Sequence, residues 1–208
     1  IGKKAFCNCT RLPSVKIPDS VTSIGNSAFA GCTGLPVYFN IRYAGSYVVE
    51  VVDKSLDVYY VVNYARFIAE SAFSGCTEMT LIDLPNTLTT IGDYAFRGCS
   101  ALPSVDIPVA VTSIGKNAFN GCTNLSTVNF NATNCSYMGS ESSPVFNGCA
   151  NLTTLNIGEN VQKIPNYAFK DCTGLTSVTI PNSVTSIGGS AFSGCSGLTS
   201  VTIPNSVT

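Results

Sequence analysis

A unit of 23 residues recurs along this chain, and no other feature of the sequence limits the fold as strongly. It is clearest from Leu175 to Gly197, after which Leu198 begins the next copy. A unit this short cannot bury its apolar side chains alone, so successive units must stack on a shared core. We therefore expect one solenoid domain spanning residues 1–208, with units starting near residues 12, 35, 79, 102, 125, 152, 175 and 198.

The order of residues within the unit predicts the shape of each coil. The spacing Leu175, Val178, Ile180 is typical of a short strand whose intervening residues face solvent. A proline then turns the chain in most units, and the next apolar pair forms a second inward-facing side. The Ala-Phe segment that follows is too short for more than one helical turn closed by glycine. These features predict a right-handed leucine-rich-repeat solenoid of the α/β class, with short parallel strands and short helical or 3-10 turns.

Phenylalanine and cysteine each recur at one position of the unit. One cysteine per unit lacks the paired spacing of zinc sites, and the chain has no histidine to complete one. Stacking would bring equivalent cysteines within disulfide range, but with parallel Cβ directions that strain the bond. We interpret both columns as core packing without metal or cofactor, and leave Cys7 and Cys135, which fall outside the column, as candidates for a disulfide or reactive thiol. The predicted core columns are Phe29, Phe73, Phe96, Phe119, Phe169, Phe192, Cys32, Cys76, Cys99, Cys122, Cys172 and Cys195.

Two stretches interrupt the period. Residues 47–52 and 58–62 are rich in valine and tyrosine and flank the polar segment 53–57, which predicts a β-hairpin within an irregular unit at about 37–70. A second interval is four residues longer than the others, which places an insertion within residues 131–144, where Ser, Asn and Gly predominate. Both departures are expected at the surface of the solenoid or covering a widened part of its core.

Tyrosines gather around the predicted hairpin. Tyrosine offers a large contact area with a polar tip, and it is enriched in binding hot spots. This favours a recognition surface, while the alternative is that the rings cover a widened core. The candidate binding residues here are Tyr43, Tyr47, Tyr59, Tyr60 and Tyr64.

Two aspartates form a second candidate site. Asp83 and Asp106 occupy the same strand position in adjacent units, so their carboxyl groups should project from one face about 5 Å apart, near the spacing of retaining glycosidases. Equivalent positions elsewhere hold Lys, Asn and Thr, which favours a solvated strand face. A weak calcium site and a catalytic pair remain as alternatives.

Composition excludes several functions. The 11 basic and 12 acidic residues form no patch that would attract nucleic acid. Without histidine, Ser-His and Cys-His nucleophile pairs cannot form, so we expect no enzyme. No apolar run is long enough for membrane insertion within these residues. The chain begins and ends inside a unit, and we expect the native array to be longer.

The motif Ile-Pro-Asn-Ser-Val-Thr-Ser-Ile-Gly, continuing to Ala-Phe-Ser-Gly-Cys at residues 180–195, resembles the BspA-like leucine-rich repeats. That family comprises surface and secreted proteins of anaerobic bacteria and some protists. The resemblance implies a secreted or cell-surface adhesion module that binds protein, such as host matrix or another cell, or a glycan. Two alternatives are a spacer within a longer surface protein and, more remotely, a carbohydrate-active enzyme using Asp83 and Asp106.

Overall fold

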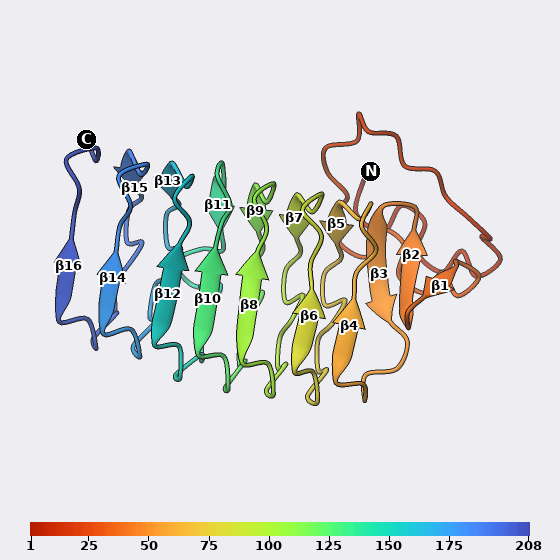
Figure 1. The fold of residues 1–208 in the computed structure, drawn as a ribbon. Helices are drawn as coiled ribbons and strands as arrows, with labels where there is room; N and C mark the ends of the chain where they lie inside the picture. Colours follow the sequence, from red (N-terminus) through yellow and green to blue (C-terminus); the bar gives the residue numbers. More distant parts are fainter.

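The chain forms a solenoid in which each coil stacks on the preceding one (Figure 1). We describe it from a computed structural model that covers residues 1–208. The core is one cluster of buried apolar residues that reaches from Ile17 to Cys195 without a break. The predicted solenoid with short parallel strands is confirmed.

One row of parallel strands follows the Leu-x-x-Val-x-Ile part of the coils. Equivalent residues pair directly, so that Val105, Val128 and Leu155 lie side by side and point into the core. Their neighbours in sequence point outward, as the alternation of side chains along a strand requires. The row consists of β4 (Val58–Tyr60), β6 (Leu81–Asp83), β8 (Ser104–Ile107), β10 (Thr127–Phe130), β12 (Thr154–Ile157), β14 (Ser177–Thr179) and β16 (Ser200–Thr202).

A second row lines the opposite edge of the coils (Figure 1). It consists of the two-residue strands β5 (Phe67–Ile68), β7 (Thr90–Ile91), β9 (Ser113–Ile114), β11 (Tyr137–Met138), β13 (Lys163–Ile164) and β15 (Ser186–Ile187). At its N-terminal end three antiparallel strands extend it, namely β1 (Val37–Tyr38), β2 (Ile41–Ala44) and β3 (Tyr47–Val51). The strand β3 joins the two parts by pairing in parallel with β5.

An antiparallel hairpin is present in the irregular unit, but it is formed by β2 and β3 and not by the two predicted segments. Residues 47–52 and 58–62 do not pair with each other. Instead β3 pairs with β2 across a tight turn at Gly45, whose φ is +57°. The loop at residues 53–57 carries the chain to the other row, where β4 pairs in parallel with β6 as an ordinary coil strand. Both apolar runs contain strands as predicted: β3 pairs with β2 and with β5, and β4 pairs with β6.

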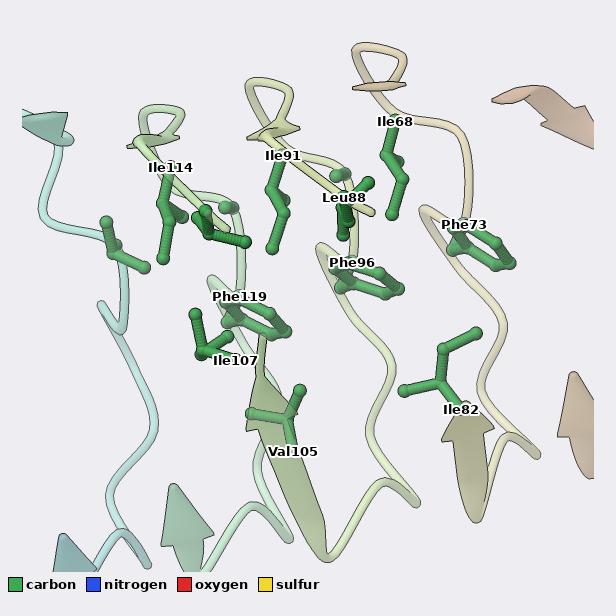
Figure 2. Close-up of a cluster of buried hydrophobic side chains, with 14 of the residues drawn as sticks. Ile68, Phe73, Ile82, Leu88, Ile91, Phe96, Val105, Ile107, Ile114 and Phe119 are labelled. Carbon is green, nitrogen blue, oxygen red and sulfur yellow. The ribbon is translucent and has the colours of Figure 1, made fainter. Parts of the chain in front are cut away.

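Stacked phenylalanine rings run along the interior (Figure 2). The ring centroids of Phe73 and Phe96 are 5.0 Å apart, and those of Phe96 and Phe119 are 4.9 Å apart, with nearly parallel planes. This spacing follows the separation of adjacent strands, because each ring projects from an equivalent backbone position. Phe29 and Phe169 are equally buried, whereas Phe192 is only partly covered.

The Ala-Phe segments form runs of β-turns where helical turns were expected. Around Phe96, Ala95 N–H donates to Gly92 O and Cys99 N–H donates to Phe96 O, so each bond spans three residues. The residue before the alanine has a left-handed backbone, with φ of +55° at Tyr94. Because a right-handed helix needs negative φ throughout, this residue stops one from forming. The same conformation recurs at Ser27, Ser71, Asn117, Tyr167 and Ser190.

The cysteine column packs inside the core as free thiols. Most of these thiols lie against the carbonyl group of a phenylalanine in the preceding coil, as Cys99 Sγ does with Phe73 O at 3.2 Å and Cys122 Sγ with Phe96 O at 3.2 Å. Burial raises the pKa of the Cys76 thiol to about 11. The column members from Cys32 onward are therefore apolar packing groups, and most of them also donate a weak hydrogen bond.

The insertion at residues 131–144 explains why Cys135 is not an accessible thiol. One extra residue lies between Phe130 and Cys135, which places Cys135 where Val111 stands in the preceding coil. Its side chain is 1% exposed, and burial raises its pKa to about 11. The remaining inserted residues form a narrow loop closed by an antiparallel bridge between Ser140 and Ser143. The expectation of a reactive Cys135 is therefore wrong, whereas Cys7 is half-buried.

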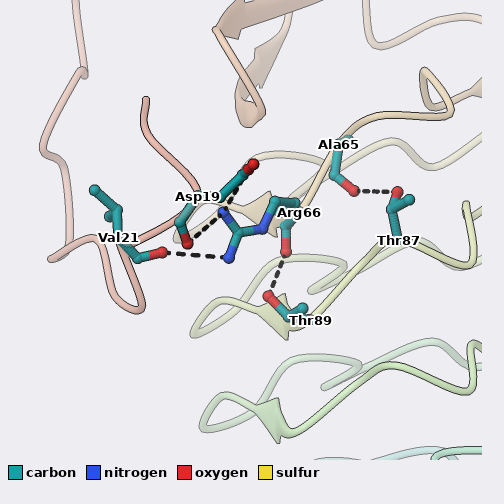
Figure 3. A network of polar contacts seen from close by, with 6 residues as sticks. All are labelled: Asp19, Val21, Ala65, Arg66, Thr87 and Thr89. Carbon is teal, nitrogen blue, oxygen red and sulfur yellow. Dashed lines mark hydrogen bonds and ion pairs between the residues drawn. The ribbon is translucent and has the colours of Figure 1, made fainter. Parts of the chain in front are cut away.

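Arg66 fastens the N-terminal coil to the second row (Figure 3). Its guanidinium group donates to Asp19 O and Val21 O at 3.2 and 3.4 Å and lies 3.4 Å from the Asp19 carboxylate. The same group lies over the Phe67 ring, 5.1 Å from its centroid. Since the Asp19 side chain is fully exposed, the carbonyl contacts and the ring rather than the ion pair hold this coil in place.

Replacing Phe119 by alanine should lower the free energy of unfolding by about 3–5 kcal/mol, because a ring stacked on both sides leaves a cavity. Denaturant unfolding followed by circular dichroism measures the change. Ser104→Ala, on an exposed strand position, is the control and should change little. A loss below about 1 kcal/mol for Phe119→Ala would contradict a core role for the column.

Stability should fall as the pH rises from 9 toward 11. The Cys135 thiol has a pKa of about 11 in the fold against 9.0 for an unperturbed cysteine, so only the unfolded chain releases its proton within this window. Below pH 9 the thiol is protonated in both the folded and the unfolded chain, so its contribution to the free energy of unfolding is constant. Cys135→Val should flatten the fall measured by chemical denaturation, since valine fills the same position in the preceding coil. An unchanged slope would show that the thiol is not desolvated.

Candidate functional site

The outward side of the first strand row is a column of polar residues that begins with an aromatic one. Tyr60 lies beside Asp83, and Asn129 lies between Asp106 and Asn156, because the parallel register joins equivalent positions. The Asn129 amide donates to the Asp106 carboxylate, and Asn156 Nδ2 donates to Asn129 Oδ1 at 2.7 Å. Asp106, Asn129 and Asn156 are therefore already bonded to one another across neighbouring coils.

The structure places Asp83 and Asp106 on the neighbouring strands β6 and β8, with both side chains exposed. Only Asp106 belongs to the amide ladder. An exposed carboxylate in such a row can accept hydrogen bonds from hydroxyl, amide or cationic groups of a partner. A catalytic or calcium-binding role for the pair stays a prediction. The structure contains no group of three or more Asp, Glu, His or Cys residues placed to hold a metal ion.

A shallow groove of about 670 Å³ lies on the same face farther along the array. It covers β12 and β14 and is lined mainly by hydroxyl and amide side chains, including Thr154, Asn156, Ser177 and Thr179. Glu159 stands at its edge. Small hydroxyl groups offer hydrogen bonds but little apolar contact area, so this groove lacks the large side chains that usually dominate binding energy.

The five predicted tyrosines divide into two groups. Tyr43, Tyr47 and Tyr59 are at most 3% exposed and belong to the core, so burial removes them from any contact surface. Burial raises the pKa of Tyr43 and of Tyr47 to about 12. Tyr60 and Tyr64 are half-exposed and remain candidates. For the first three, the alternative that the rings cover a widened core agrees with their positions.

Several aromatic side chains are exposed in the N-terminal part of the array. We use the name aromatic ridge for Tyr38, Phe39, Tyr60 and Tyr64, which are between 47% and 71% exposed. Partial burial, and then the charge on Tyr38, raise the pKa of Tyr64. Tyr60 brings the ridge to the polar column through its pairing with Asp83.

The ridge rests on the buried tyrosines beneath it. The Tyr38 ring lies 6.0 Å from the ring of Tyr43, and the Tyr43 hydroxyl accepts a hydrogen bond from Val62 N–H at 3.3 Å. Val62 lies between Tyr60 and Tyr64 in sequence. The hairpin and the β4 coil are thus fixed to each other below the surface, which holds the exposed rings in place.

Tyr38 and Phe39 are the ridge residues absent from the predicted set, and Phe39 is the more exposed of the two. It lies at the turn between β1 and β2 with φ of +49°, and Asn40 follows with φ of +67°. Asn40 is held by two hydrogen bonds, since its Nδ2 donates to Asp53 O at 2.6 Å and its Oδ1 accepts from Asp53 N–H at 2.9 Å. Left-handed Tyr94 and Tyr167 belong to the repeated turn, whereas Phe39 belongs to no repeated position. A bulky exposed residue in a strained backbone favours a functional role.

The sequence matches the family described as BspA type Leucine rich repeat region, in six copies over residues 1–49, 54–173 and 141–208. No protein with a curated function matches the chain. The structure has no helix of the length and apolar character needed to cross a membrane.

Several solved structures share the fold. A leucine-rich repeat protein from Bacteroides ovatus is 25% identical with a TM-score of 0.60, covering 94% of this chain and 47% of that one. A leucine-rich repeat protein from T. pallidum is 26% identical with a TM-score of 0.63, covering 76% and 75%. The pneumococcal vaccine antigen PcpA is 18% identical with a TM-score of 0.62, covering 84% and 50%. The chain spans about half the length of the B. ovatus protein.

Phe39→Gly should leave the free energy of unfolding within about 1 kcal/mol of the parent, because relief of the left-handed strain offsets the entropy that glycine adds to the unfolded chain. Asn40→Ala should cost about 1–3 kcal/mol, since it removes both contacts to Asp53. Chemical denaturation compares the two variants. A large loss for Phe39→Gly would show that its ring supports the fold.

Proposed function

Because the chain belongs to the BspA-type leucine-rich repeat family, we propose that it is a secreted or cell-surface adhesion module that binds a macromolecular partner. The partner is a protein of the extracellular matrix or of another cell, with a glycan as the alternative. The observation that carries this proposal is the aromatic ridge, which exposes four large rings in the N-terminal part of the array.

The composition of the ridge suits protein recognition. Tyrosine and phenylalanine give large contact areas at a small loss of side-chain entropy, and their rings are fixed in advance by the buried tyrosines below. Asp83 and Asp106 lie toward the polar column and would form the rim of such an interface. An apolar centre with a polar rim is the usual anatomy of a protein-binding surface.

The proposed location outside the cell is supported by the resemblance to surface and secreted repeat proteins. The chain has few charged residues, and Ser, Thr, Asn and Gly supply most of its polarity. The proposal includes no enzymatic activity. The remote alternative, a carbohydrate-active enzyme, needs both aspartates, so activity on glycans that disappears in an Asp83→Ala, Asp106→Ala double variant would favour it.

A spacer is the second candidate, and the C-terminal coils favour it. Their outward positions are Ser177, Thr179, Ser200 and Thr202, all small and almost identical between coils. A surface without large side chains offers little binding energy, and near-identity between coils is what a spacer requires. On this view the chain would only hold another domain away from the cell.

Binding to an array of matrix proteins and glycans separates the two candidates. A Tyr60→Ser, Tyr64→Ser double variant should bind at least about tenfold more weakly than the parent, because exposed aromatic anchors carry most of an interface's energy. Deleting residues 47–62 is unsuitable, since it removes the buried Tyr47 and Tyr59. The matched control is Thr179→Ala, Thr202→Ala on the same face.

Each outcome is decisive. Loss of binding in the tyrosine variant with binding retained in the threonine control supports the ridge. Equal binding by both variants contradicts it, and no binding by the parent favours the spacer. Phe39→Gly should weaken binding in the same direction as the tyrosine variant while leaving the stability nearly unchanged.

A further inference from the structure

Two Asn-Gly pairs occupy the same repeated turn in adjacent coils. They are Asn120-Gly121 and Asn147-Gly148, each following the phenylalanine of its coil. The glycines have nearly the same left-handed backbone, with φ of +73° and +75°. Asn-Gly is the dipeptide in which the backbone nitrogen most easily reaches the asparagine side chain, because glycine places no side chain in the way. The two pairs thus differ only in their surroundings.

Hydrogen bonding distinguishes the two pairs. Gly121 N–H donates to Asn147 O at 2.9 Å, and Asn120 Nδ2 donates to the same oxygen at 3.1 Å. The equivalent N–H groups of Gly75 and Gly98 are bonded in the same way to the next coil. Gly148 N–H has no acceptor in the structure, and the Asn147 side chain is exposed without a hydrogen bond.

We propose that Asn147 is a site of spontaneous deamidation in the folded protein. The Gly148 nitrogen gives up its proton to the solvent and attacks Cγ of Asn147. A new bond from the Gly148 nitrogen to Cγ closes a succinimide ring, the bond from Cγ to Nδ2 breaks, and the side-chain nitrogen takes a proton from the solvent and leaves as ammonia. Water then opens the ring at one of its two carbonyl groups and gives aspartate or isoaspartate. Water is the only co-reactant, and no oxidation or reduction occurs.

Hydrogen bonds to the Asn147 carbonyl oxygen protect Asn120 from the same reaction. Its nucleophile, Gly121 N–H, is held by a carbonyl oxygen, and its side-chain amide is held by that oxygen too. Both bonds must break before the ring can close at Asn120. Breaking them slows the reaction by about tenfold or more relative to Asn147, on the usual net strength of such bonds.

The first reaction prepares the second. Isoaspartate at residue 147 routes the backbone through Cγ, and the former main-chain carbonyl group, which accepts from both Gly121 N–H and Asn120 Nδ2, becomes a carboxylate on a side branch that the peptide bond to Gly148 no longer holds in place. Asn120 then loses the fixed acceptor that protects it and becomes reactive in turn. Deamidation of the folded chain is therefore ordered, with Asn147 before Asn120.

The test is incubation of the folded protein in mildly alkaline buffer, with peptide mapping by mass spectrometry over time. Asn147 should convert first, at least about tenfold faster than Asn120, and Asn120 should follow after a lag. In urea-denatured chain the two sites should react at similar rates, because only the fold distinguishes them. The rate at Asn147 should increase with pH, since the nucleophile is the deprotonated nitrogen.

Two variants give matched controls. Asn147→Ser keeps the backbone carbonyl and removes the first reaction, so Asn120 should stay slow throughout. Asn120→Ser should leave the rate at Asn147 unchanged. Equal rates at both sites in the folded protein would contradict the proposed faster reaction at Asn147. An Asn120 rate that is the same in the parent and in Asn147→Ser would contradict the proposed order.

Discussion

Backbone hydrogen bonds between corresponding segments of successive coils hold the array in register. Phe73 N–H donates to Ala95 O at 2.8 Å and Phe96 N–H donates to Ala118 O at 2.7 Å. Because the coils repeat this bond, the rings stack, most column thiols lie beneath a carbonyl group of the preceding coil, and the outward side chains form straight columns. Stability is thus shared between neighbours, as in other repeat proteins, and no coil is independent.

The sequence predicted the regular coils well because their evidence is local and repeated. Apolar and polar residues alternate from Val105 to Ile107, and the same alternation recurs in the other units. It therefore predicts which side chains point inward. The sequence could not predict which strands pair with Tyr47–Val51, because an apolar run can pair with any neighbouring strand. The actual partners depend on how the coils stack. The prediction of a helical turn was wrong because each of the Ala-Phe segments contains a residue with a left-handed φ, such as Ser190. Serine and tyrosine rarely adopt this conformation, so their presence in the sequence does not indicate it.

The candidate site was only half predictable. Tyr59 and Tyr60 are adjacent, so they must point to opposite faces, and alignment of Tyr60 with Asp83 would have shown which one lies outside. Tyr43 and Tyr47 lie in an irregular part without such an alignment, and their burial depends on the antiparallel pairing that sequence did not supply. Phe39 was missed because its exposure follows from the tight turn between β1 and β2. Only two residue pairs join these strands, and so short a hairpin leaves no recognisable pattern in the sequence.

The column of buried thiols places one chemical probe in nearly every coil, from Cys32 to Cys195. A thiol sealed in the core meets a modifying reagent only when its own coil opens, so the labelling rate of each cysteine reports the local opening free energy at that place. Labelling of the cysteines would thus measure local opening separately along the array. Such a measurement would show whether the coils beneath the aromatic ridge are the most rigid part of the molecule.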